Sequence, residues 1–148
     1  MVNKKIALIF FFTFFSRLAS SDVVTDIEIN ESGIAYIGHS KVEQEGCKLF
    51  RPTAEQLAEY FNQAQRLEFG GWREHTYYSP CIVTGKVSFK SGQSGKFTIQ
   101  SSGYGYGYGT FNNIDINFFH KENPWFDPFQ CSYAMGDEPD PGCDEPQP

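Results

Sequence analysis

The sequence lacks the patterns that metal sites and many hydrolase sites require. Its four cysteines include no CxxC pair, and its histidines are scattered at His39, His75 and His120. Structural zinc sites take their ligands from closely spaced Cys and His residues, so we expect no metal and no cofactor. The G-x-S-x-G motif of many serine hydrolases is also missing. We therefore expect no enzyme, and a small hydrolase using His75 and a carboxylate is the least favoured alternative.

Basic residues are scarce, and none follows Lys121. Three of the 12 basic residues (Lys4, Lys5 and Arg17) lie in the amino-terminal segment, which leaves nine against 18 acidic residues and a net charge of −9. Nucleic acids and anionic membrane surfaces are bound through basic faces. Neither is expected as a partner, whereas a cationic protein fits this charge.

The sequence contains only one long apolar run, from Ile6 to Phe15. This run is about half the roughly 20 residues that a membrane span needs. It follows two lysines and precedes Ala-Ser-Ser, a pattern typical of a secretory signal peptide cleaved before Asp22. We expect residues 1–21 to be that signal peptide and the protein to be periplasmic or secreted, with no membrane span after cleavage. Residues 22–143 are expected to form a single domain, and residues 144–148 a flexible acidic tail.

The four cysteines all follow the expected signal peptide. An exported chain with an even number of cysteines is expected to form disulfides. Of the three possible pairings we favour Cys47–Cys81 with Cys131–Cys143, and the other two stay open. Each bridge would stabilise the fold by about 3–4 kcal/mol through loop closure.

One segment has the pattern of an amphipathic helix. Thr53 and Gln56 match a capping box, and apolar residues at helical spacing follow until Gly70 and Gly71. We expect this helix to run from about Thr53 to Glu68 and to pack one face on a sheet.

The strands of that sheet are predicted from alternating apolar and polar residues. Such segments are residues 81–90, 96–101 and 110–120, with one or two shorter strands in residues 25–39. Asn112 and Asn113 suit a two-residue hairpin turn. The expected fold class is therefore α+β, an antiparallel β-meander with one packed amphipathic helix, stabilised by disulfides.

A glycine-tyrosine run, SGYGYGYGT, occupies residues 102–110. A phosphate-binding loop needs a strand–loop–helix context, and the hairpin residues that follow the run do not provide one. An unbroken strand from Phe97 to Phe111 would be roughly 50 Å long, which exceeds the width of so small a domain. We therefore expect a bend near residues 102–105.

Two arguments orient this run. Continuing the alternation of Phe97 and Ile99 places the glycines toward the core, and the expected hairpin sets Gly107 opposite Phe118 and Tyr108 opposite Asn117. The tyrosines then form an outward strip, about 6.6 Å apart. A purely structural role, with tyrosines stabilising a glycine-weakened strand or covered by the tail, stays open. The candidate binding residues are Tyr104, Tyr106, Tyr108, Lys96, Asp115 and Asn117.

Two stretches, YYSPCIVTGKVSF and NPWFDPFQCSYAMGDEP, resemble a group of small, exported, largely uncharacterised proteins of Gram-negative bacteria. The resemblance covers about residues 47–143 and implies export and a disulfide-bonded fold, without a mechanism. The matching positions are Ser79, Pro80, Cys81, Gly85, Trp125, Asp127, Pro128, Cys131, Tyr133, Gly136, Asp137, Glu138 and Cys143.

The expected function is that of a small exported binding protein. Its acidity, size and aromatic strip favour an inhibitor or immunity-type protein that blocks a cationic toxin or wall hydrolase. The alternative is a cell-envelope module that binds glycan on the tyrosine strip.

Overall fold

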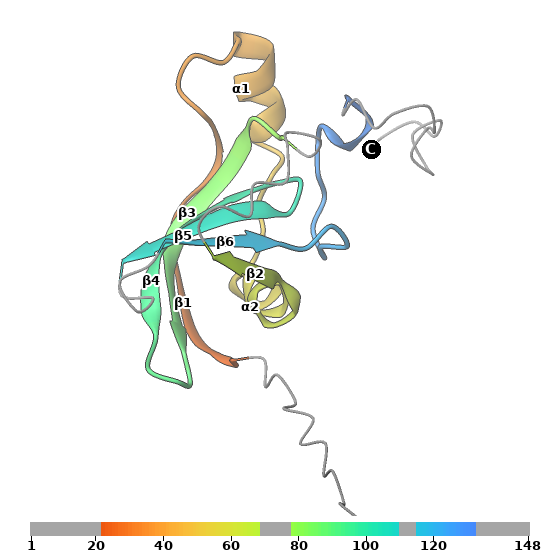
Figure 1. The fold of residues 1–148 in the computed structure, drawn as a ribbon. Coiled ribbons are helices and arrows are strands. Elements are labelled where there is room, and N and C mark those ends of the chain that lie inside the picture. The colour runs from red at the N-terminus through yellow and green to blue at the C-terminus, as the bar shows by residue number, and fades with distance from the viewer. Residues whose placement is uncertain (1–21, 69–77, 110–114, 133–148) are drawn as a thin grey trace, which may run out of the picture.

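The computed structural model describes residues 22–68, 78–109 and 115–132 (Figure 1). Within these residues, antiparallel strands form one six-stranded sheet in the order β1-β3-β4-β5-β6-β2. The strands are β1 (Val24–Ala35), β2 (Gln65–Glu68), β3 (Cys81–Phe89), β4 (Ser94–Gln100), β5 (Tyr104–Gly109) and β6 (Ile116–Phe119). The helices are α1 (Lys41–Cys47), α2 (Ala54–Gln63) and the short 3-10 helix η1 (Gln130–Ser132). Strands β3 to β6 form a meander, so the α+β prediction is confirmed.

Helix α2 begins at the predicted capping box. The Thr53 hydroxyl accepts a hydrogen bond from the Gln56 N–H, and the Gln56 side chain accepts one from the Thr53 N–H. The helix ends at Gln63 because Ala64 is extended, with φ −60° and ψ 135°. The expectation of a helix as far as Glu68 is therefore wrong. The chain turns instead and forms β2, which pairs with β6.

The apolar face of α2 packs on one face of the sheet, as Figure 1 shows beside β2. Phe61 is the centre of this contact, and its ring meets three rings of the sheet edge-on. These belong to Phe89, Phe97 and Phe118, with centroids 6.1, 5.1 and 5.1 Å away. Such edge-to-face pairs add stability beyond the apolar area that they bury. This face of the sheet is therefore the core face.

The sequence also forms a second helix, α1, which we did not expect. The Ser40 hydroxyl accepts a hydrogen bond from the Glu43 N–H, and the Glu43 carboxylate accepts one from the Ser40 N–H. These two bonds form a capping box like that of α2. The S-x-x-E spacing that predicts such a box is present in the sequence. Among the described residues, neither α1 nor any other helix has the length and apolar character that crossing a membrane requires.

The disulfide Cys47–Cys81 joins the end of α1 to the start of β3, and both residues are fully buried. This confirms one bridge of the favoured pairing. Cys131 is also disulfide-bonded, whereas Cys143, its expected partner, lies outside the described residues.

Strand β1 is continuous over 12 residues, where one or two shorter strands were expected. Its pairing with β3 is irregular at three places, between Val24 and Asp26, Ile29 and Glu31, and Ser32 and Ile34. Irregularities of this kind bend and twist an edge strand. They let one long strand follow the curved sheet.

The expected bend falls at residues 101–103, which form the turn between β4 and β5. Gly103 in this turn has a φ of +83°, a conformation that glycine adopts without strain. The two strands then lie side by side, with Phe97 opposite Gly107. The predicted turn residues Asn112 and Asn113 lie outside the described residues.

The segment after β6 is tied to the fold by buried hydrogen bonds. The indole of Trp125 donates to the Ser101 carbonyl (2.8 Å), and the Ser101 hydroxyl donates to Asp127 (2.6 Å). The Ser79 hydroxyl lies 2.5 Å from that of Ser101. Buried polar groups require such partners. Ser79 and Asp127 come from the two stretches on which the resemblance is based, and both contact Ser101. These positions therefore have a structural role.

Candidate functional site

The face of the sheet opposite the core carries the predicted site. Because Phe97 and Phe118 contact α2 through Phe61, the neighbouring positions Lys96 and Asn117 belong to the other face. Residues opposite one another on adjacent strands form rows across it. We call these positions the outer face: Thr84, Lys86, Lys96, Thr98, Tyr106, Tyr108 and Asn117.

The glycines of β5 occupy the core side of this strand. Gly105 is buried opposite Ile99 and Phe118, and a Cβ atom at Gly105 would collide with the Ile99 side chain. Gly107 lies opposite Phe97 and Ile116. The tyrosine positions that alternate with these glycines therefore belong to the outer face, as the alternation predicts.

The predicted pairing of β5 with β6 is wrong by two residues. Phe118 lies opposite Gly105 rather than Gly107, and Asn117 lies opposite Tyr106 rather than Tyr108. A shift of two residues leaves every position on its face, because side chains alternate with a period of two. Residues 110–114, which include the turn on which that register was based, lie outside the described residues.

Four of the six predicted site residues lie close together in the rows. Lys96 is opposite Tyr108, and Tyr106 is opposite Asn117. Tyr104 is half-buried at the start of β5. Exposed Asp115 precedes β6 and belongs to none of the rows.

Tyr104 also lies near the core. Burial, and to a smaller extent the nearby Tyr104, raises the pKa of the Tyr60 phenol well above its usual value. That phenol donates a hydrogen bond to the Gly103 carbonyl (3.0 Å). Tyr104 is therefore partly structural.

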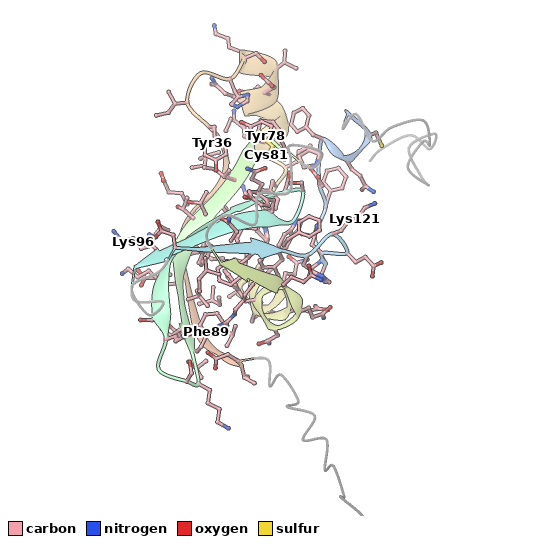
Figure 2. The ribbon with its side chains drawn as sticks, viewed as in Figure 1. Tyr36, Tyr78, Cys81, Phe89, Lys96 and Lys121 are labelled. Atoms are coloured by element: carbon pink, nitrogen blue, oxygen red, sulfur yellow. A yellow bond between two sulfur atoms is a disulfide. The ribbon has the colours of Figure 1, made fainter. Side chains whose placement is uncertain are left out.

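Two lysines occupy the middle of the outer face. Lys86 and Lys96 lie directly opposite one another on β3 and β4, and both are exposed. The Lys86 ammonium is 3.2 Å from a Glu28 carboxylate oxygen. Lys96 makes no ion pair with another described residue, and Figure 2 shows it on the side of the sheet away from α2.

A second group of polar and aromatic residues lies beside α1, and the sequence did not predict it. Figure 2 shows Tyr36 and Tyr78 next to one another there. Their rings are stacked, with centroids 6.4 Å apart, and the His39 ring is 6.1 Å from that of Tyr78. We call Tyr36, His39, Glu43 and Tyr78 the Tyr78 cluster.

Hydrogen bonds link Tyr78, His39 and Glu43 in a line. The Tyr78 hydroxyl is 3.0 Å from Nε2 of His39, and Nδ1 of His39 is 3.1 Å from Oε1 of Glu43. The hydroxyl and N–H of Ser40 donate to Oε2 of Glu43 and, with His39, lower its pKa to about 2. Glu43 is therefore a carboxylate at neutral pH. Tyr78 is 39 residues from His39, so only the fold brings the cluster together.

The remaining polar clusters have structural roles. Ser79 and Ser101 are fully buried and Asp127 is 7% exposed, so a substrate has no access to this chain of hydroxyls and carboxylate. Within the described residues, no group of three or more His, Cys, Asp or Glu side chains is placed to hold a metal ion. His75, the base of the hydrolase alternative, lies outside the described residues.

Comparisons with protein-family models, with curated proteins and with solved structures found no match. Function is therefore inferred from the outer face and the Tyr78 cluster themselves.

Proposed function

We propose that the protein is an exported binding protein whose outer face takes a cell-envelope glycan with anionic groups. Export rests on the signal-peptide pattern of residues 1–21. The observation that carries the proposal is the cross-strand register, which sets Tyr106 beside Thr98 and Asn117, and Tyr108 beside Lys96.

These residue types suit a glycan. An aromatic ring offers a large, rigid apolar surface, on which the apolar face of a sugar ring packs. Thr98 and Asn117 supply a hydroxyl and an amide on the neighbouring strands, and both groups donate and accept hydrogen bonds. Sugar hydroxyls need partners of both kinds.

Lys96 decides the charge of the ligand. Lys86 is paired with Glu28, whereas Lys96 makes no ion pair with another described residue. An anionic ligand would therefore compensate the charge of Lys96, and a cationic one would be repelled by it. The outer face therefore suits a glycan with carboxylates better than it suits the cationic toxin or hydrolase of the inhibitor hypothesis.

The test is co-sedimentation with purified peptidoglycan sacculi, a carboxylate-bearing envelope glycan. We expect the wild type to bind and the double variant Tyr106→Thr/Tyr108→Thr to bind at least about tenfold more weakly. Threonine has a high preference for strands, so β5 keeps its conformation while it loses both rings. We expect Lys96→Gln to weaken binding about threefold or more and to reduce its dependence on salt.

Two control variants match these changes elsewhere on the surface. Lys90→Gln removes an exposed lysine from the turn between β3 and β4, and Tyr78→Ala removes an exposed tyrosine beside α1. Both should bind sacculi like the wild type. A folded double tyrosine variant with undiminished binding, or a wild type that stays in solution, would show that the outer face is not a glycan site.

A further inference from the structure

The Tyr78 cluster is a second surface, separate from the outer face. Its rings are held in place by the hydrogen bond between Tyr78 and His39, by the stacking of Tyr36 on Tyr78 and by the contact between His39 and Glu43. Tyr78 nevertheless remains 44% exposed. Side chains that are ordered before binding lose little entropy when a partner arrives.

The cluster has the electrostatics of a cation site. When the imidazole of His39 is neutral and its Nδ1–H donates to Glu43, its Nε2 accepts from the Tyr78 hydroxyl, and in this state the cluster carries the one negative charge of Glu43. The faces of the two tyrosine rings are also electron-rich. Oε2 of Glu43 accepts two hydrogen bonds from Ser40, whereas Oε1 accepts one from His39. Oε1 therefore keeps one acceptor position for a ligand.

Of the described lysines, neither Lys41 nor Lys48 forms an ion pair with Glu43. Lys48 lies 2.6 Å from Glu45 and forms an ion pair with it. Lys41 precedes Glu43 by two residues in α1, and residues so spaced do not face one another on a helix. Apolar side chains border the cluster, since Ile37 is fully exposed next to Tyr36 and Val42 is 79% exposed next to Glu43.

We propose that the Tyr78 cluster binds an arginine side chain of a basic partner protein, with the guanidinium paired to Glu43 and stacked on Tyr78. Arginine fits because its planar group stacks on aromatic rings and donates to carboxylates. It is also enriched at protein interfaces, together with tyrosine. Ile37 and Val42 supply apolar contact around it, and the net charge of −9 that the chain has without residues 1–21 favours encounter with a basic protein.

The probe is N-acetyl-L-arginine amide, titrated into the full chain and followed by NMR. We expect saturable shifts of the Tyr36, His39 and Tyr78 resonances with a dissociation constant of about 1–10 mM, as for a small ligand with few contacts. N-acetyl-L-citrulline amide has nearly the same shape without the charge. It should bind at least about tenfold more weakly.

Glu43→Gln is the diagnostic variant. Glutamine also satisfies the capping box, so α1 keeps its start while the cluster loses its charge, and arginine amide should bind about fivefold or more weakly. Glu45→Gln makes the same change of charge in the same helix, at a residue that pairs with Lys48. It should leave the affinity unchanged.

Three results would each overturn the inference. The first is equal binding of the arginine and citrulline amides, and the second is an equal loss of affinity in the Glu43 and Glu45 variants. The third is the absence of shifts in the Tyr78 cluster up to about 50 mM arginine amide. None of them bears on sacculus binding, so the two proposals are tested independently.

Discussion

Gly103 lies in the turn between β4 and β5 with a φ of +83°, and a Cβ atom there would collide with the His120 carbonyl oxygen. Gly92, in the turn between β3 and β4, has a similar φ of +87° but open space around it. We expect Gly103→Ala to lower the free energy of unfolding by about 3 kcal/mol, because strain and collision combine. Gly92→Ala should lower it by only about 1 kcal/mol. Urea unfolding measures both, and equal losses would mean that His120 moves away without cost.

The residues of the two surfaces differ in how far the sequence reveals them. The assignment of positions 106 and 108 to the outer face follows from their alternation with glycine. This is a local property, and an error of two residues in the predicted register does not change it. The Tyr78 cluster depends on a contact between segments 39 residues apart. No local pattern reports such a contact, so His39 and Tyr78 were not predicted as partners.

At the scale of elements, α1 is a helix of seven residues whose start depends on Ser40 and Glu43. The pKa of Glu43 in the folded chain is about 2, below its usual value of 4.5. The carboxylate therefore stabilises the cap fully above about pH 4.5, and this contribution is lost as the pH falls toward 2. We expect the carboxyl carbon of Glu43 to titrate near pH 2 by NMR, and the α1 amides to exchange faster below that pH.

Glu43→Gln provides the control for this titration. Its α1 amides should show no such change between pH 4.5 and pH 2, since the amide side chain does not titrate. A Glu43 midpoint near 4.5 would contradict the prediction and would mean that Ser40 and His39 do not hold the carboxylate in solution.

The helix ends show why some elements are predictable and others are not. The start of α2 depends on Thr53 and Gln56, three residues apart, and the sequence predicts it correctly. Its end depends on β2, which exists because it pairs with β6 about fifty residues later. The helical pattern of apolar residues continues past Gln63 and gives no sign of that strand. The capping box of α1 was equally visible as S-x-x-E, so this helix was predictable.

For the whole molecule, the buried Cys47–Cys81 bridge fixes α1 against the sheet. We expect the double variant Cys47→Ala/Cys81→Ala to lose about 3–4 kcal/mol of stability, because the unfolded chain regains the freedom of a loop of 34 residues. Urea unfolding of the variant and of the wild type under non-reducing conditions measures the difference. A loss below about 1 kcal/mol would mean that the bridge adds little to the packing of α1.

The placement of Trp125 determines when the chain can finish folding. Its ring packs on Phe50 and Tyr60, with centroids 5.8 and 5.2 Å away, and the carbonyl of Pro124 accepts a hydrogen bond from Gln56. Synthesis delivers Phe50 and Tyr60 before Trp125, so this part of the core is complete only after the segment that follows β6 has been made. A chain that ends before Trp125 therefore lacks an aromatic partner for two rings that are fully buried in the finished fold.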